Sequence, residues 1–267
     1  LEVSPATVSA AWRQLRRRNV IAGQGRQGSW VSYHPMRSGP QRFSDIETLW
    51  SSTTRNLIHA TPDPALLPDL RPALAAAVQD DNLNSYYRQP ITDSLRAVLA
   101  TVWPATHEDF LVTSGGYEGL RLLLSSSVMP GERVAVADPS TARLLDILEH
   151  VGARPIAVAT DHEGPTVASL RRALARKPVV FIYEPRSSSH FGVSLSAARR
   201  DSLAAVLDEA GVLTIEDDGV GDIAEARYQG LGQVLPEQTI LVRSYSKTHG
   251  PDLRVAVIGG QAHLIKG

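Results

Sequence analysis

The first thirty residues change from a helical to a strand-like spacing of hydrophobic positions. A stripe of four residues at the spacing i, i+3, i+4, i+7 predicts a helix over residues 6–18 with that stripe buried: Val8, Ala11, Trp12 and Leu15. Ser4 and Pro5 are of the types preferred at the N-cap and at the first helical position. Two short hydrophobic segments, 20–22 and 29–31, flank a glycine-rich turn and predict a two-stranded ribbon.

From about residue 56 onward, short apolar segments alternate with stretches of helical period. Seven of these segments are predicted to be strands: 110–113, 133–137, 155–159, 179–183, 212–215, 239–242 and 255–258. Such alternation is typical of a parallel sheet with helices on both faces. We therefore predict an α/β fold with a mainly parallel, seven-stranded sheet, in which ligands gather at the carboxyl ends of the strands.

The intervening residues show no sustained period and contain Pro35, Gly39 and Pro40, which is typical of a linker. The sequence thus predicts a small module over 1–33, a linker over 34–55 and an α/β domain over 56–267. Because the first residue is Leu1 and the last residues follow directly on a strand-like segment, we expect the chain to be part of a longer protein.

Charge is distributed unevenly along the chain. The formal net charge is −1, but residues 1–43 contain seven arginines and one acidic residue, a balance of +6 that leaves about −7 for the remainder. This asymmetry is typical of a DNA-binding module attached to an acidic body, and a solvated basic helix face is the alternative. The sequence contains no cysteine, which excludes disulfides, thiolate catalysis and cysteine-ligated zinc, and no metal site is predicted. Without a span-length apolar run or a signal peptide, we expect a cytoplasmic protein that is not membrane-bound.

The segment Ser244-Tyr245-Ser246-Lys247-Thr248-His249-Gly250-Pro251-Asp252-Leu253-Arg254 carries the strongest chemical signal. It follows a predicted strand, where Lys247 can form a Schiff base if its surroundings keep the amine partly deprotonated. The hydroxyls and Arg254 are suited to binding a phosphate. A lone lysine after a strand is usually a surface residue, but the spacing of Ser, Pro and Arg around Lys247 favours a cofactor site.

This segment resembles the lysine signature of class I/II aminotransferases, Ser-x-Ser-Lys-x-x-x-Pro-x-Leu-Arg. The resemblance implies that Lys247 carries pyridoxal 5′-phosphate and performs the catalytic step, and that Ser244 and Arg254 bind the phosphate. Thr113-Ser114-Gly115-Gly116-Tyr117 resembles the glycine-rich turn whose backbone N–H groups hold the phosphate in that family. Asp217, in Ile215-Glu216-Asp217-Asp218, would pair with the pyridinium nitrogen. Tyr87, in Tyr87-Arg88-Gln89-Pro90, would reach the phosphate of a neighbouring subunit, which implies a homodimer.

Three positions differ from the enzyme pattern. Ser189 stands where the family has the Asn that contacts the ring hydroxyl, O3′, and Val220 stands where it has a Tyr. Thr141 replaces the aromatic residue that stacks on the ring. The resemblance also implies that the carboxyl-terminal domain, which carries the substrate-binding Arg in that family, lies outside this chain. We therefore expect efficient transamination to be lost, while cofactor binding is retained in weakened form.

The amino-terminal segment Ser4-Pro5-Ala6-Thr7-Val8-Ser9-Ala10-Ala11-Trp12-Arg13, with Gly25-Arg26-Gln27-Gly28-Ser29-Trp30-Val31, resembles the second half of a GntR-type winged helix-turn-helix. The resemblance implies a recognition helix and a wing, with the first helix of the motif outside the chain. The residues expected to contact DNA are Ser4, Thr7, Ser9, Arg13, Arg26 and Gln27.

Together, the two halves resemble the MocR-type regulators, a GntR subgroup. The resemblance implies a transcription regulator that binds operator DNA and senses pyridoxal phosphate, or a small amine or amino acid that reacts at Lys247. One alternative is a working aminotransferase that acts on a small amino acid. Another is a homologue that binds DNA without any cofactor. The basic amino-terminal residues and the changes at Thr141 and Ser189 favour the regulator over the enzyme.

Overall fold

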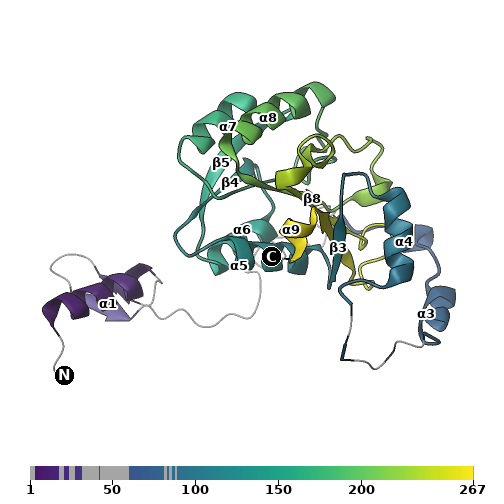
Figure 1. Ribbon diagram of the computed structural model, residues 1–267, viewed down its shortest axis with the longest axis horizontal. Coiled ribbons are helices and arrows are strands. Elements are labelled where there is room, and N and C mark those ends of the chain that lie inside the picture. The colour runs from purple at the N-terminus through teal and green to yellow at the C-terminus, as the bar shows by residue number, and fades with distance from the viewer. Residues whose placement is uncertain are drawn as a thin grey trace, which may run out of the picture.

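The computed structural model describes residues 4–17, 21–23, 28–31, 42, 60–80, 83, 86–87 and 89–266. Eight strands form one sheet in the order β3-β10-β9-β8-β7-β4-β5-β6 (Figure 1). Their bounds are β3 Asp109–Thr113, β4 Arg133–Asp138, β5 Arg154–Asp161, β6 Gly164–Pro165, β7 Val180–Tyr183, β8 Leu213–Asp218, β9 Thr239–Ser244 and β10 Ala256–Gly260. Strands β5, β4, β7, β8 and β9 run parallel to their neighbours in that series, whereas β10 is antiparallel to both β9 and β3.

The predicted fold class and all seven predicted strands are confirmed, but the count of seven is wrong. The additional strand is β6, which pairs antiparallel with the end of β5 at the edge of the sheet. It consists of Gly164 and Pro165 alone, so it carries no apolar alternation that a sequence pattern could register.

Helices cover both faces of the sheet, as predicted (Figure 1). On one face α5 (Gly116–Ser127) and α6 (Ala142–His150) pack against Val134, Ile182, Ile215 and Val242. On the other, α7 (Val167–Leu174) and α8 (Ala197–Ala210) pack against the residues of opposite parity, such as Ala135 and Phe181. Because side chains alternate along a strand, the near-continuous apolar strands supply both cores.

The body contains further helices and several 3₁₀ turns. They are α3 (Arg71–Ala77), α4 (Asp93–Val102), α9 (Ala262–Lys266) and the 3₁₀ turns η2 (Pro64–Leu66), η3 (Gly221–Ile223), η4 (Leu231–Gln233) and η5 (Pro236–Gln238). Helix α4 packs beside a third hydrophobic cluster that contains Leu99, Trp103 and Phe110. No helix within the described ranges is long and apolar enough to cross a membrane.

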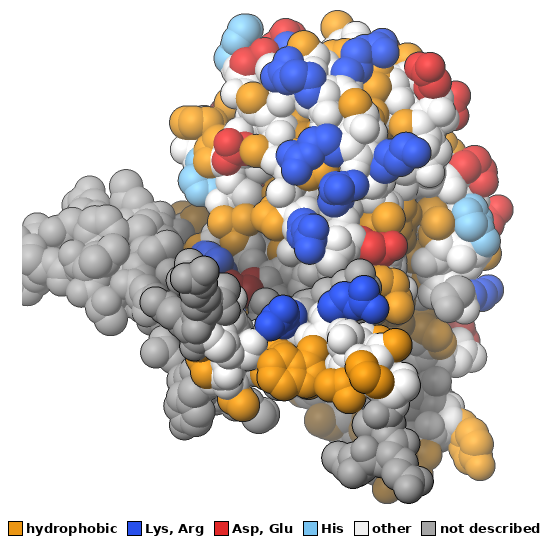
Figure 2. Space-filling model, turned by 90° about the vertical axis from the view of Figure 1, so that its left-hand side faces the viewer, with side chains coloured by type: hydrophobic (Ala, Val, Ile, Leu, Met, Phe, Trp, Pro, Cys, Tyr) orange, Lys and Arg blue, Asp and Glu red, His pale blue; other side chains and the backbone are white. Residues whose placement is uncertain are grey.

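The amino-terminal elements are α1 (Pro5–Arg17), β1 (Ile21–Gly23) and β2 (Ser29–Val31), with β1 and β2 antiparallel. Ser4 caps α1 as predicted, because its Oγ accepts a hydrogen bond from the Thr7 N–H at 3.2 Å. The prediction that the apolar stripe is buried is wrong for the described residues, since Trp12 remains 44% exposed. The two-stranded ribbon is too small to cover this face of the helix. Figure 2 faces the side of the molecule on which α1 lies, and shows hydrophobic and basic side chains together at that surface.

Candidate functional site

The residues predicted to bind a phosphate meet at the start of α5. Gly115 precedes the helix with a φ of 95°, and a Cβ added there would lie 2.7 Å from a terminal nitrogen of Arg254. A Cβ added at Gly116 would lie 3.3 Å from the Cβ of Ser244, the last residue of β9. The two glycines therefore allow a guanidinium and a hydroxyl to approach the first turn of α5, whose N–H groups lack helical partners. This arrangement is suited to a phosphate.

Lys247 lies three residues beyond β9 and is partly buried. Its Nζ donates a hydrogen bond to the carbonyl oxygen of Ala60 at 2.8 Å. Burial and the positive charge of Arg143 lower the pKa of the Lys247 amine. A lower pKa increases the deprotonated fraction, which is the form that attacks a carbonyl carbon.

Asp217 is the last residue but one of β8 and faces a hollow between the sheet and the start of α6. Burial, together with the negative charges of Glu184 and Asp218, raises the pKa of the Asp217 carboxyl to about 8. A cation opposite Asp217 would reverse this effect, because it favours the charged form of the acid. A positively charged group bound in the hollow would therefore favour the ionised form of Asp217.

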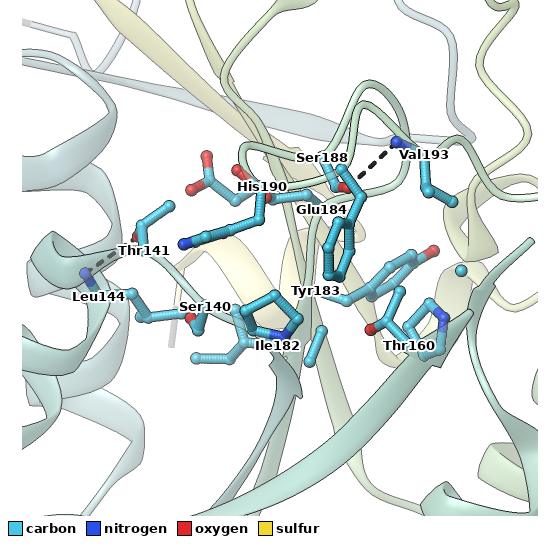
Figure 3. A pocket seen from close by; sticks show the side chains of 16 residues that line it. Ser140, Thr141, Leu144, Thr160, Ile182, Tyr183, Glu184, Ser188, His190 and Val193 are labelled. Carbon is cyan, nitrogen blue, oxygen red and sulfur yellow. Dashed lines mark hydrogen bonds between the residues drawn. The ribbon is translucent and has the colours of Figure 1, made fainter. Parts of the chain in front are cut away.

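The same hollow is lined by Thr141, Glu184, Ser188 and His190, whose side chains lie around it in Figure 3. Thr141 is the N-cap of α6, and its Oγ1 accepts a hydrogen bond from the Leu144 N–H at 3.2 Å. This cap gives Thr141 a role in the helix that an aromatic residue at the same position could not fill.

Ser189 does not line the hollow but is bound to a residue that does. Its N–H donates to Glu184 Oε2 at 2.7 Å, and its hydroxyl donates to Oε1 of the same carboxyl group. Burial raises the pKa of Glu184, against the opposing effect of the hydrogen bonds from Ser189. Glu184 was not among the predicted site residues. The available signal was its position directly after the apolar strand 179–183, at a carboxyl end.

The two predicted tyrosines differ in their surroundings. Tyr117, the second residue of α5, packs against the hydrophobic cluster beneath that helix. Tyr87 is 99% exposed in the single chain, which is compatible with a reach toward a neighbouring subunit. The cofactor contacts of both residues stay predictions.

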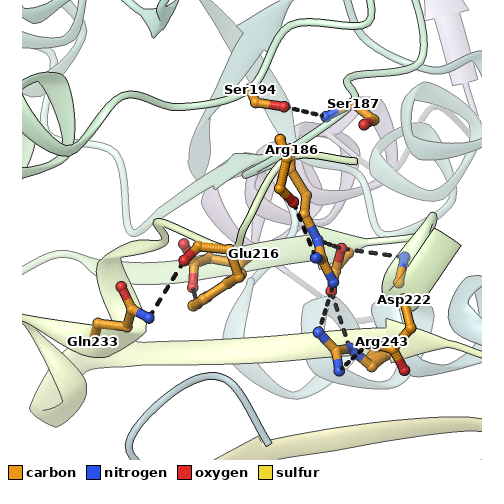
Figure 4. Close-up of polar contacts among 11 residues, drawn as sticks. Arg186, Ser187, Ser194, Glu216, Asp222, Gln233 and Arg243 are labelled. Carbon is orange, nitrogen blue, oxygen red and sulfur yellow. Dashed lines mark hydrogen bonds and ion pairs between the residues drawn. The ribbon is translucent and has the colours of Figure 1, made fainter. Parts of the chain in front are cut away.

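A buried ion cluster supports the end of β8 on the opposite side of the sheet (Figure 4). Asp218 accepts two hydrogen bonds from Arg186, both at 2.9 Å, and two from Arg243. Although burial alone would raise it, these two arginines lower the pKa of the Asp218 carboxyl. Arg243 also hydrogen-bonds Asp222 and lies over the Trp103 ring, 5.6 Å from its centroid. The sequence analysis missed this cluster, which fixes the strand that carries Asp217.

Glu216 anchors the same strand through a second buried network. It accepts hydrogen bonds from the hydroxyls of Tyr183 and Tyr228 and from the Leu231 N–H at 2.7 Å. Fully satisfied buried networks of this kind hold the backbone rigidly. Along β8 the side chains therefore alternate between anchors on one side, Glu216 and Asp218, and Asp217 on the other. The described residues contain no group of three or more His, Asp and Glu that could hold a metal ion.

The predicted DNA-contacting residues of the helix are all exposed. Ser4 and Thr7 lie at the start of α1, where their hydroxyl oxygens are 2.9 Å apart, and Ser9 and Arg13 follow along the helix. Arg16 joins α1 to the ribbon, because it donates to Ser29 Oγ at 2.8 Å. Two further predicted contacts, Arg26 and Gln27, lie outside the described residues.

Comparison with known proteins adds to this picture. No family model matches the chain. It is 30% identical over 98% of its length to the vitamin B6 salvage pathway transcriptional repressor PtsJ of Salmonella typhimurium. It is 29% identical over 95% of its length to the pyridoxine biosynthesis transcriptional regulator PdxR of Corynebacterium glutamicum. The chain is a relative of the MocR-type transcription regulators. It spans about 60% of the length of these curated relatives, 60% of PtsJ and 57% of PdxR.

Solved structures confirm the aminotransferase fold of the body of this MocR-type relative. The α-aminoadipate aminotransferase LysN of Thermus thermophilus matches 77% of the chain, and the chain covers 56% of LysN, with a TM-score of 0.70 and 26% identity. That structure is a complex with N-(5′-phosphopyridoxyl)-L-leucine. The multiple substrate aminotransferase of Thermococcus profundus matches 86% of the chain, which covers 62% of that enzyme, with a TM-score of 0.74 and 18% identity. At that identity the second match supports the fold alone.

Proposed function

We propose that the protein is a transcription regulator whose aminotransferase-like domain binds pyridoxal 5′-phosphate as its sensory ligand. The observation that carries the proposal is the convergence of Gly115, Gly116, Ser244 and Arg254 at the first turn of α5. Phosphate recognition needs such a combination of free N–H groups, a hydroxyl and a guanidinium. The regulators PtsJ and PdxR, whose names refer to vitamin B6 salvage and pyridoxine biosynthesis, support this choice of ligand.

The other groups of the site fit the rest of the cofactor. Lys247 would hold its aldehyde carbon, because a partly buried amine with a lowered pKa is a competent nucleophile. Asp217 would face the ring nitrogen, whose positive charge would ionise the carboxyl group. When bound in an enzyme, the cofactor acts as an electron sink for carbanions. In this chain we assign it a sensory role, since Thr141 and Val220 leave its ring without the usual stacking and hydroxyl contacts.

The DNA-binding role is assigned to residues 1–33, joined by a linker over 34–55 to the ligand-binding part over 56–267. Its support is the capped, exposed helix α1, the ribbon β1–β2, and the balance of +6 over residues 1–43. A regulator of this kind would bind its operator as a homodimer, with one half-site for each module. A small amine or amino acid that reacts at Lys247 is a second class of effector for the same site.

The experiment is a measurement of operator affinity with full-length protein, using DNA selected in vitro and with pyridoxal phosphate present or absent. We expect the cofactor to change the dissociation constant by about 5–150-fold, the usual range of allosteric coupling. Lys247→Ala should abolish the change, while Lys177→Ala, at an exposed lysine before Pro178, should preserve it. An affinity that is equal with and without cofactor would contradict the sensory role.

A further inference from the structure

Two carboxyl groups lie side by side at the site, one of them without an assigned role. Glu184 directly follows β7 and Asp217 belongs to β8, and these strands pair in parallel with Tyr183 opposite Glu216. The next residue on each strand is therefore Glu184 beside Asp217. Both side chains line the same hollow, on the α5–α6 side of the sheet. Their proximity is also evident in the charge of Glu184, which raises the pKa of Asp217.

The strand order relates these groups to the parts of the cofactor. In pyridoxal phosphate the carbon that a lysine attacks is flanked on one side by the phosphate arm and on the other by the ring hydroxyl, with the ring nitrogen opposite. In the sheet, Ser244 of the phosphate cradle ends β9, Asp217 is on the adjacent β8, and Glu184 follows β7 beyond it. A ring bound with its phosphate near Ser244 and its nitrogen at Asp217 would therefore have its hydroxyl edge toward the end of β7.

We propose that Glu184 is a cofactor-binding residue that donates a hydrogen bond to the ring hydroxyl oxygen of pyridoxal phosphate. It thereby takes over the contact that Ser189 and Val220 no longer make. This inference rests on the proposed function, because it concerns the same ligand. Ser189 becomes a positioning residue, since its N–H and hydroxyl both hold the Glu184 carboxyl group in place.

Glu184 must keep its proton in order to donate. Burial favours the protonated acid. Two adjacent carboxyl groups resist ionising together, as the effect of Glu184 on the pKa of Asp217 illustrates, so a carboxylate at Asp217 would favour the protonated form of Glu184 further. When the ring nitrogen ionises Asp217, the remaining proton therefore belongs to Glu184. Of the groups that act on Glu184, only His190 and the hydrogen bonds from Ser189 favour its ionised form.

The test uses full-length protein loaded with pyridoxal phosphate and measures the pH at which the absorbance band of the lysine-linked cofactor changes. The ring oxygen accepts a hydrogen bond from the protonated nitrogen that links lysine to the cofactor. A second donor to the same oxygen weakens that hydrogen bond and therefore favours loss of the proton from the nitrogen. Glu184→Ala should therefore raise the pH midpoint by about one unit. Glu184→Gln retains an N–H donor and should stay near the wild type. Glu209→Gln, at an exposed residue of α8, is the matched control and should not move the midpoint.

The outcomes separate the two proposals. An unchanged midpoint in Glu184→Ala, or a lowered one, would overturn the assignment of Glu184 while leaving the cofactor site intact. A shift in Glu184→Gln as large as that in Glu184→Ala would also overturn it, because donation is then not the cause. A wild type without any cofactor band would overturn the proposed function and this inference together. Thermal melting of each variant identifies any loss of folding, and Glu184→Gln keeps the test decisive if the alanine variant is unstable.

Discussion

At the scale of single residues, Asp217 is a buried acid that lowers the stability of the fold. Its pKa of about 8 in the folded chain exceeds the value near 3.9 expected in the unfolded chain. Between these values the folded state binds more protons, so stability falls as the pH rises from about 4 to about 8. Such a cost is expected of a residue with the role proposed for Asp217, which is to pair with a cationic ligand.

Asp217→Asn removes this penalty, and we expect cofactor-free protein to be stabilised by roughly 1 kcal/mol or more at pH 8, a few degrees in melting temperature. The gain should shrink toward zero as the pH falls to about 4, where both side chains are neutral. The same variant should bind pyridoxal phosphate more weakly. Melting curves across this pH range check the prediction, and a variant that is less stable than the wild type at pH 8 would contradict it.

The sequence places residues together where a motif repeats a known spacing, but it does not single out a residue whose proposed role depends on one neighbour. Gly115, Gly116, Ser244 and Arg254 were predicted together, and the fold brings them into one cradle. Glu184 was missed because one acid after a strand is indistinguishable from a solvated strand end. Its importance depends on its neighbour Asp217, which only strand pairing reveals.

At the scale of elements, the first turn of α5 joins the sheet to the proposed phosphate site. Gly115 in this turn contacts another residue of the proposed site, whereas a second glycine with a similar positive φ has no such contact. Gly115 has a φ of 95° and lies against Arg254, whereas Gly131 has a φ of 91° and a Cβ there would meet nothing within 4 Å. Substitutions at Gly115 and Gly131 can therefore separate the effect of backbone strain from the effect on the proposed phosphate site.

We expect Gly115→Ala and Gly131→Ala each to lose about 1–3 kcal/mol of stability through the strained φ. Only Gly115→Ala should also weaken pyridoxal phosphate binding, by about tenfold or more, because its methyl group displaces the Arg254 guanidinium. Equilibrium binding at a temperature where both variants remain folded is the measurement. Equal affinities for the two variants would argue against a phosphate at this turn.

Helix α1 permits a separate test of the DNA-binding module. If Arg13 contacts a phosphate, Arg13→Ala should weaken binding to every DNA sequence alike and reduce the salt dependence of log K by about 0.9. Arg227→Ala, at an exposed arginine of the body, should change neither quantity. An unaltered salt slope in Arg13→Ala would remove this residue from the DNA contact.

Hydrophobic patterns in the sequence predicted the longer strands but neither the shortest strand nor the order of the strands in the sheet. Apolar runs located seven strands, of which β7, β9 and β10 are buried throughout and β5 is exposed at alternate residues, but the two residues of β6 have no run to detect. Strand order was also beyond reach: β10 lies between β3 and β9, although it is the last strand in the sequence. The burial of the apolar stripe of α1 was predicted wrongly for a related reason. Helical periodicity predicts which face of a helix is apolar, but it does not predict what covers that face.

At the scale of the whole molecule, a basic amino-terminal segment is joined to a body with an aminotransferase fold and an altered ring site. Thr141 caps α6 instead of stacking on a ring, and Val220 offers no hydrogen bond. We therefore expect chemistry that requires a rigidly held, electron-demanding ring to be impaired, and attachment of the ligand to Lys247 to be retained.

We accordingly expect transamination of common amino acids by the full-length protein to be slow or absent. Loss of one hydrogen bond to a charged group and of ring stacking costs about 2–4.5 kcal/mol, which implies a rate penalty of about 30-fold to 2,000-fold. Restoring Asn at position 189 and Tyr at position 220 should raise any residual rate. A turnover near 10 s⁻¹, about the median for enzymes, would instead make the aminotransferase function primary.

The central claim is that this molecule holds pyridoxal phosphate on Lys247, and the absorbance spectrum of the full-length protein tests it most directly. On addition of the cofactor we predict a band at roughly 400–430 nm in the wild type, the region expected of a protonated lysine–cofactor link. The band should be absent from Lys247→Ala and present in Lys177→Ala. A wild-type spectrum that the cofactor leaves unchanged, or a band that survives in Lys247→Ala, would contradict the claim.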